Sequence, residues 1–134
     1  MAAIVRELDF DLCRRILLRM EELWESGTPS LPGRYCFEGY GSENISYNIE
    51  KLLKARLIKT TVPQNWTRGQ LSIWPMGFMQ NGRRFLEAAK DEQRWTEAIE
   101  TVLAQDGPES LVPLKIVLFA ERGRDRGQST HEKN

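Results

Sequence analysis

The chain has 134 residues, of which 40% are hydrophobic and 28% charged, and its 19 basic residues balance its 19 acidic residues. This length and composition favour a single folded domain over a disordered segment. The chain contains no apolar run near the ~20 residues that a membrane-spanning helix requires, and its first residues lack the pattern of a signal peptide. We therefore expect a cytoplasmic protein that does not insert into a membrane.

Few residues in the chain offer reactive chemistry. His131, the only histidine, lies in a polar C-terminal tail. Cys13 and Cys36 lack the CxxC spacing of a zinc or redox site, and we expect both in the core, Cys13 on a helix and Cys36 in a strand. The acidic pairs Glu21-Glu22 and Asp91-Glu92 fall on predicted exposed helix faces. The sequence therefore predicts a protein that is not an enzyme and that uses no cofactor and no metal.

The first predicted element is a helix that begins near Asp9 or Asp11. Its apolar residues recur at three- and four-residue spacing, which places them on one face: Phe10, Cys13, Ile16, Leu17, Met20, Leu23 and Trp24. A loop rich in Gly, Pro and Ser follows over residues 26–33. Residues 34–38 then predict a short strand, which ends at the turn Gly39-Tyr40-Gly41.

Residues 42–58 are the most informative stretch, because they combine a helix with the start of a strand. Ser42 or Glu43 caps the predicted helix, whose apolar stripe is formed by Ile45, Ile49, Leu52 and Leu53. An extended segment follows from Leu57 to Val62, residues 63–69 form a polar turn, and residues 70–74 alternate as a returning strand. A helix followed by two extended runs indicates a winged-helix domain.

Three further apolar patterns predict helices in the C-terminal part. Residues 81–89 form the first; the stripe of the second, which contains Trp95, is shifted in phase and indicates a break near Lys90-Asp91. Ser110 caps the last helix, and residues 122–134 form a flexible polar tail. We thus expect an α+β fold over residues 1–121, a winged helix-turn-helix-like domain with a C-terminal helical extension.

Two of these segments resemble a known family. Residues 45–58, ISYNIEKLLKARLI, resemble the "SYHVKLLEEAGLI" block of a bacterial and phage family catalogued as domain of unknown function 2513. Residues 81–89, NGRRFLEAA, together with Trp95, resemble its "EGHEFLDAARDDTIW" block. The similarity covers residues 8–121. It implies a winged-helix architecture, often encoded in phage or prophage genomes, with no established activity.

The chain departs from the family pattern at two informative positions. Asn48 stands where the family usually has His, so any role of that imidazole is absent. Arg56 stands where the family has Gly, which would end the helix in the left-handed conformation. Arg56 must therefore adopt that conformation at a cost of ~1 kcal/mol or end the helix differently.

Binding to double-stranded DNA is the first functional hypothesis. Residues 41–75 carry a net charge of +3, and the segments before and after them carry −2 and −1. As a recognition helix, the central helix would contact an adenine edge through Asn48 and phosphates through its lysines. The candidate DNA-binding residues are Asn44, Ser46, Tyr47, Asn48, Lys51, Lys54, Lys59 and Arg68. They could equally be solvated residues, and with so few cations we expect weak binding by one copy and a functional homodimer.

A protein-interaction module that does not bind DNA is the alternative hypothesis. The balanced charge and the four tryptophans favour it. Trp66 lies in the predicted polar turn, where a large aromatic side chain is unfavourable unless it contacts a partner or folds back. The other candidate residues, Trp74, Met76 and Phe78, form an apolar cluster that could instead pack against the first helix. DNA-linked regulation is narrowly favoured over this alternative.

Overall fold

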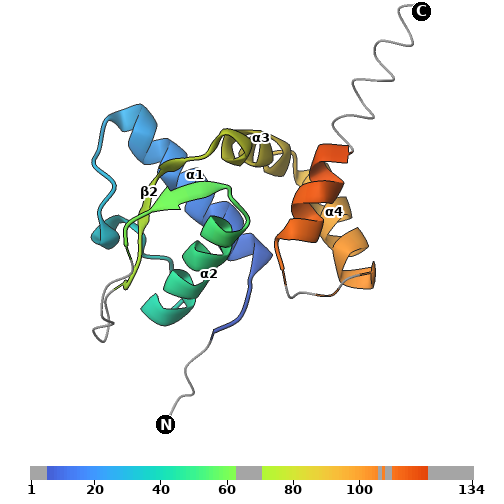
Figure 1. The fold of residues 1–134 in the computed structure, drawn as a ribbon, viewed down its shortest axis with the longest axis horizontal. Coiled ribbons are helices and arrows are strands. Elements are labelled where there is room, and N and C mark those ends of the chain that lie inside the picture. Colours follow the sequence, from blue (N-terminus) through green and yellow to red (C-terminus); the bar gives the residue numbers. More distant parts are fainter. Residues whose placement is uncertain (1–5, 63–70, 106, 108–109, 121–134) are drawn as a thin grey trace, which may run out of the picture.

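The computed structural model describes residues 6–62, 71–105, 107 and 110–120. The elements along the chain are α1 (Phe10–Ser26), the short 3-10 helix η1 (Pro32–Arg34), α2 (Ser42–Lys54), β1 (Ile58–Thr60), β2 (Pro75–Phe78), α3 (Gln80–Ala89) and α4 (Glu92–Gln105). Residues 112–120 form a last helix. In Figure 1, α1, α2 and the two strands lie together, and α3 leads from them to α4 and the last helix. The predicted α+β fold is confirmed, and α2 followed by an antiparallel strand pair is compatible with a winged helix.

Helix α1 begins and ends as its sequence dictates. The Asp9 carboxylate accepts a hydrogen bond from the Leu12 N–H at 2.9 Å, which caps the first turn. The helix ends at Gly27, whose φ of 69° is left-handed, and the Thr28 N–H reaches back to the Leu23 carbonyl at 2.9 Å. Between these ends the apolar stripe is buried, including Leu12, Cys13, Ile16, Leu17 and Met20.

A buried polar network joins the segment before α1 to α2. The Asn48 side chain, which is fully buried, donates to the carbonyls of Glu7 (2.9 Å) and Asn44 (2.8 Å). Its oxygen accepts from the Asp9 N–H at 2.8 Å and from the Cys13 thiol at 3.4 Å. The neighbouring Asn44 side chain accepts from the Glu7 N–H at 2.8 Å. Residues 7–9 are thus held against one flank of α2.

The network also changes the chemistry of its neighbours. Burial raises the pKa of the Cys13 thiol, and the negative charge of Asp9 adds to this effect. The Tyr40 hydroxyl donates to the second Asp9 carboxylate oxygen at 3.1 Å, so the capping residue of α1 also holds the loop that precedes α2. Burial, followed by this hydrogen bond, raises the pKa of Tyr40. Cys13 is therefore protected both by its position and by its protonation state.

The prediction that the polar side chains of α2 face solvent is wrong for three residues. Asn48 is fully buried, and Asn44 and Ser46 are 7% and 6% exposed. Asn44 and Asn48 lie four residues apart, on the flank of α2 covered by residues 7–9, and Ser46 accepts a hydrogen bond from the Ser72 N–H at 3.2 Å. The apolar stripe of α2 shows which face meets the core, but it does not show that chain segments cover both flanks.

Replacing Asn48 by Ala should destabilise the fold by about 2–4 kcal/mol, because backbone groups of Glu7, Asp9 and Asn44 lose their buried partner. Urea unfolding measures this change. Lys54→Ala on the exposed face of α2 is the matched control and should stay within about 0.5 kcal/mol. The Cys13 thiol should also react faster with a thiol reagent in the Asn48 variant. Equal stability of the two variants would contradict the role assigned to Asn48.

The sheet consists of two antiparallel strands with an irregular register. Ile58 pairs with Phe78 and Lys59 with Gly77, but Thr60 pairs with Pro75, so Met76 is the extra residue of a bulge. Pro75 is tolerated as the first residue of its strand. The returning strand was predicted over residues 70–74, and the structure corrects this to Pro75–Phe78. The polar turn expected over residues 63–69 lies outside the described residues.

The short strand predicted over residues 34–38 is also wrong. The structure has η1 at Pro32–Arg34, followed by irregular backbone and a turn at residues 38–39. The apolar residue Tyr35 suggested a strand, but it is buried by its side chain alone and no neighbouring strand pairs with its backbone. As a result Cys36 is exposed and not in the core.

Helix α2 ends in the left-handed conformation although its residue there is not Gly. Arg56 has a φ of 60°. Its N–H donates to the Leu53 carbonyl at 2.9 Å, and the Leu57 N–H donates to the Leu52 carbonyl at 3.1 Å. The same pair of bonds closes α1 at Gly27. These two hydrogen bonds satisfy carbonyls in the last turn of α2, and the chain then continues into β1. Arg56 adopts the positive φ at the conformational cost expected for a residue with a side chain.

Arg56→Gly should therefore stabilise the protein by about 1 kcal/mol, because glycine adopts this conformation without steric conflict. Arg56→Ala, which removes the charge but keeps the Cβ atom, is the control and should change the stability little. The free energy of unfolding in urea distinguishes the two. A gain in both variants would mean that the charge, and not the backbone, is responsible.

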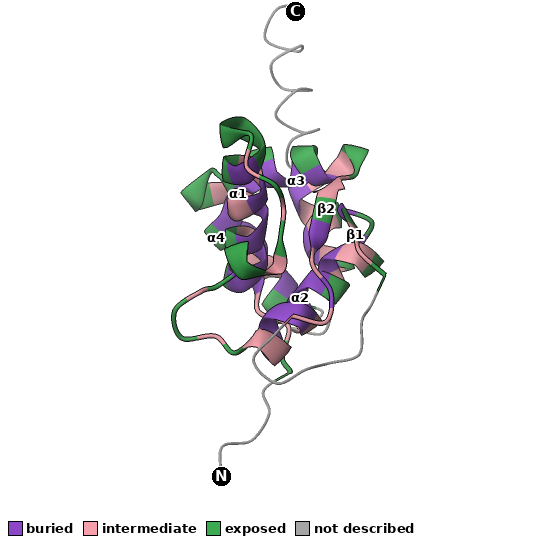
Figure 2. Ribbon diagram, turned by 90° about the vertical axis from the view of Figure 1, so that its left-hand side faces the viewer, coloured by how far each residue is buried: buried purple, intermediate pink, exposed green. Residues whose placement is uncertain are grey.

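The C-terminal helices complete the core. The predicted break is confirmed, since α3 ends at Ala89 and α4 begins at Glu92, where the Asp91 carboxylate accepts from two backbone N–H groups at 3.1 Å. Phe85 and Trp95 pack edge to face with centroids 6.0 Å apart. Buried residues from Phe10 to Leu118 form one apolar cluster, and Figure 2 shows the buried sides of the helices turned inward. Of the helices described, none is long and apolar enough to span a membrane.

Candidate binding groove

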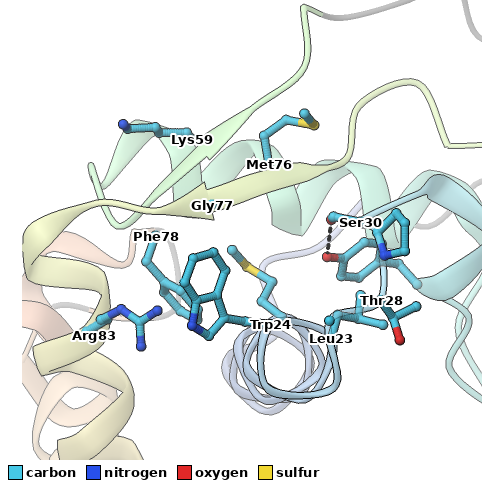
Figure 3. A pocket seen from close by; sticks show the side chains of 13 residues that line it. Leu23, Trp24, Thr28, Ser30, Lys59, Met76, Gly77, Phe78 and Arg83 are labelled. Atoms are coloured by element: carbon cyan, nitrogen blue, oxygen red, sulfur yellow. Dashed lines mark hydrogen bonds between the residues drawn. The ribbon is translucent and has the colours of Figure 1, made fainter.

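An open groove of about 600 Å³ lies between the end of α1, the loop that follows it, β2 and the first turn of α3. Figure 3 shows the side chains that line it. The lining residues are Met20, Leu23, Trp24, Gly27, Thr28, Pro29, Ser30, Tyr35, Lys59, Met76, Gly77, Phe78 and Arg83. Segments far apart in the sequence therefore meet at this surface.

Two large apolar side chains of the groove are exposed to solvent. Trp24 is 72% exposed and Met76 is 58% exposed. Figure 3 shows Trp24 on the side of β2 that faces α1 and Met76 on the other side of the strand. Met20, Leu23 and Tyr35 of the lining are buried, and Phe78 is half-buried. An exposed indole beside a buried apolar floor is a feature that marks an interaction site.

Arg83 lies beside two aromatic rings of the groove. Its guanidinium carbon is 5.6 Å from the Trp24 ring centroid and 4.9 Å from that of Phe78. Cation–π attraction at these distances favours this position of the guanidinium. Within the described part of the chain, Arg83 forms no ion pair with a carboxylate, unlike Arg14, which pairs with Glu92 at 2.7 Å. Lys59 supplies a second cation to the lining and likewise pairs with no described carboxylate.

The wall opposite Arg83 is held by a chain of hydrogen bonds. Figure 3 marks the bond between the Tyr35 and Ser30 hydroxyls, at 2.6 Å. Ser30 in turn donates to the Pro75 carbonyl, which ties the loop after α1 to the start of β2. Burial raises the pKa of Tyr35 and outweighs the opposing effect of Ser30. The wall is therefore rigid, and its hydroxyls serve the fold.

The candidate DNA-binding residues do not form one surface. The exposed stripe of α2 carries Glu43, Tyr47, Glu50, Lys51 and Lys54. On it the Lys51 ammonium lies 5.1 Å from the Tyr47 ring centroid, and Lys54 pairs with Glu50 at 3.1 Å. Asn44, Ser46 and Asn48 are buried, as described above. Lys59 belongs to the groove lining, but Figure 3 shows its side chain extending away from Trp24 and Arg83, and Arg68 lies outside the described residues.

The candidate protein-interaction residues divide differently. Met76 and Phe78 line the groove, whereas Trp74 is half-buried and packs against the core. Trp66 lies outside the described residues. Sequence reasoning missed Trp24 and Arg83, the two residues that define the groove. It placed Trp24 on the buried stripe of α1, but Trp24 follows Leu23 directly, and only Leu23 faces the core in this last turn.

A family model described as "Hypothetical protein (DUF2513)" matches residues 7–108. The chain belongs to this family. The resemblance seen in the sequence is thereby confirmed, and the matched segment extends from the lead-in of α1 to the end of α4. Neither the curated proteins nor the solved structures contain a match to the chain.

The groove of this DUF2513 protein is suited to binding. Its polar groups are two cations, which are donors only, and hydroxyls such as those of Ser30 and Tyr35, which already bond to each other. Among the described residues there is no group of three side chains that could hold a metal ion. What the arrangement can do chemically is accept an apolar side chain and an anion side by side.

Gly82 sets the position of Arg83 in the DUF2513 fold. A Cβ atom at Gly82 would overlap the Leu57 carbonyl oxygen and lie 3.3 Å from the Phe78 ring. The absence of a side chain thus lets the first turn of α3 rest on the backbone that connects α2 to β1. Gly82, which belongs to the segment NGRRFLEAA that resembles the family, therefore has a packing role.

Gly82→Ala should destabilise the protein by about 2–4 kcal/mol, because backbone must move to admit the methyl group. Thermal or urea unfolding measures the loss. Gly77→Ala is the matched control, since its Cβ would meet no atom within 4 Å, and its stability should change by less than about 1 kcal/mol. If Gly82→Ala were as stable as Gly77→Ala, the close contact with Leu57 would not constrain α3.

Proposed function

We propose that this protein is a non-catalytic protein-binding module and that the groove is its binding surface. The observation that carries the proposal is Arg83, which lies beside the rings of Trp24 and Phe78 at the edge of an open apolar groove. Trp, Met and Arg are the residue types enriched at protein interfaces, and Trp and Arg dominate their binding energy.

The burial pattern supports this proposal over simple surface variation. Single exposed apolar side chains are common and need no explanation. Here, however, the exposed Trp24 of α1 lies beside Phe78 of β2 and Arg83 of α3, which are more than 50 positions further along the chain. A partner that covered this side of the groove would remove a large aromatic side chain from water beside a cation.

DNA binding is the second candidate function, and one observation favours it. The end of α2 and the start of β1 carry four cations, Lys51, Lys54, Arg56 and Lys59, and three of these side chains are exposed. This patch could contact phosphates. It has few groups to read bases, because Asn44 and Asn48 are engaged inside the fold. Binding by a homodimer, in the phage or prophage setting that the family resemblance implies, is the form in which this function would operate.

The proposed function is tested by selection of binders from a displayed library of random 12-residue peptides against the purified protein. Enriched peptides should bind wild type and lose tenfold or more in affinity with Trp24→Ser, which corresponds to at least about 1.4 kcal/mol. Leu103→Ser, which changes a 47% exposed apolar residue on α4, is the matched control and should bind normally. Fluorescence anisotropy measures the affinities.

A random duplex-DNA pool, offered to the same protein at low and near-physiological salt, provides the contrast. No peptide dependent on Trp24, together with a DNA motif retained at near-physiological salt, would replace the proposal with sequence-specific DNA binding. Retention of DNA at low salt alone would indicate only generic attraction to the basic patch and would leave the peptide result to decide.

A further inference from the structure

The groove runs beside the edge of β2 that pairs with no strand, which is bonded to the loop after α1 only at the Pro75 carbonyl among the contacts described. The described sheet has two strands, and β2 pairs only with β1. Figure 2 shows β2 between β1 and the end of α1, so its second edge faces the groove. An unpaired strand edge presents backbone donors and acceptors to any extended chain that lies along it.

The register shows which backbone groups point to this edge. The Met79 N–H donates to the Leu57 carbonyl at 2.9 Å, which makes the adjacent pair Ile58 and Phe78 the non-hydrogen-bonded type. In such a pair the N–H and C=O groups point away from the partner strand. Phe78 makes no further backbone bond to a residue that the structure describes, so its amide group is directed to the groove side unpaired.

Space is available beside the strand. Gly77 lines the groove, and a Cβ atom there would meet nothing within 4 Å. A glycine in a strand often marks a site where another backbone approaches closely. The groove is open along this position and closed beneath it by Tyr35 and Phe78. This space lies over the face of β2, where a Cβ atom would point, and the open volume beside the strand is that of the groove itself.

The charges of the lining residues indicate which side chains a partner would need. Arg83 lies with Trp24 and Phe78 on one side of β2, Lys59 extends on the other side, and no carboxylate belongs to the lining. The stacked guanidinium of Arg83 is preorganised for a carboxylate, which it can bind through two parallel hydrogen bonds. Trp24 and Phe78, which hold it, are also the apolar walls. A partner must therefore present an acidic side chain and an apolar side chain close to each other.

We infer that the groove binds an extended peptide segment that adds to β2 as a third strand, with an apolar side chain against Trp24 and an Asp or Glu carboxylate on Arg83. The inference rests on the proposed function and specifies its partner. Alternate residues of a strand share one face at a spacing of about 7 Å. The apolar and acidic residues are accordingly two positions apart in the peptide.

The experiment uses the peptides that the library selection enriches against the full chain. They should share an apolar or aromatic residue two positions from an Asp or Glu. Arg83→Gln should weaken their binding tenfold or more, and replacing the peptide acid by its amide should cause a similar loss. The two changes together should lose little more than either alone, since they remove the same interaction.

Arg84→Gln is the matched control for Arg83→Gln. Arg84 also stacks on an aromatic ring, with its guanidinium carbon 4.5 Å from the Phe119 centroid, but it does not line the groove. Its replacement should leave peptide affinity unchanged. Hydrogen exchange of the Phe78 amide, followed by NMR, reports the strand directly: peptide binding should slow it at least tenfold.

The outcomes separate this inference from the function on which it rests. Peptides that depend on Trp24, but bind Arg83→Gln normally or leave Phe78 exchange unchanged, would overturn the acidic third strand and leave a protein-binding groove. Absence of enriched peptides, or peptides indifferent to Trp24→Ser, would overturn both. Loss of affinity in Arg83→Gln and Arg84→Gln alike would point to general charge attraction and would also overturn the Arg83 site.

Discussion

The packing of the segment before α1 against α2 depends on the hydrogen bonds of one buried side chain. Asn48 uses both amide hydrogens and its oxygen to hold the lead-in of α1 against α2. A buried amide without partners would cost several kcal/mol, so the two helices can pack in this relation only while the network is complete. From that relation the rest follows along the chain: α2 turns at Arg56 into β1, β2 returns beside it, and β2 then meets the far end of α1, where the groove lies.

The network also gives physical meaning to a departure from the family pattern. Where the family usually has His, this chain has an amide that donates twice and accepts twice. A neutral imidazole has one donor and one acceptor and cannot make the same set of bonds. A DUF2513 protein with His at this position must therefore connect its N-terminal segment to α2 with fewer or different contacts. In this chain Asn48 belongs to the fold, and it is not available to read a base.

The helices were predictable from the sequence because their signals are local. Asp9, the apolar spacing of α1 and the break at Lys90-Asp91 each act within a few residues, and the structure confirms them. One error is local, because α2 begins after Gly41 and neither Ser42 nor Glu43 caps it as predicted. Most of the others concern what packs against an element from elsewhere in the chain. The flanks of α2 are covered by residues 7–9 and by Ser72, Cys36 has no strand partner, and Trp24 extends beyond the core that buries Leu23. The groove is lined by residues of α1, the loop after it, the strands and α3, which are far apart in the sequence. No single stretch of the sequence could therefore indicate it.

The contacts between distant segments also decide which surface could contribute most to the free energy of binding a partner. The exposed stripe of α2 carries acids and lysines that partly neutralise each other, and its contacts would be screened by salt. Arg83 is different, because two rings restrict its guanidinium before any partner arrives. The position of Arg83 is set by the folded structure, because Gly82 allows α3 to pack closely on the backbone that follows α2. An interaction whose geometry is already set loses less entropy on binding. The buried network that removes the base-reading side chains from α2 thus belongs to the same arrangement that holds the groove ready.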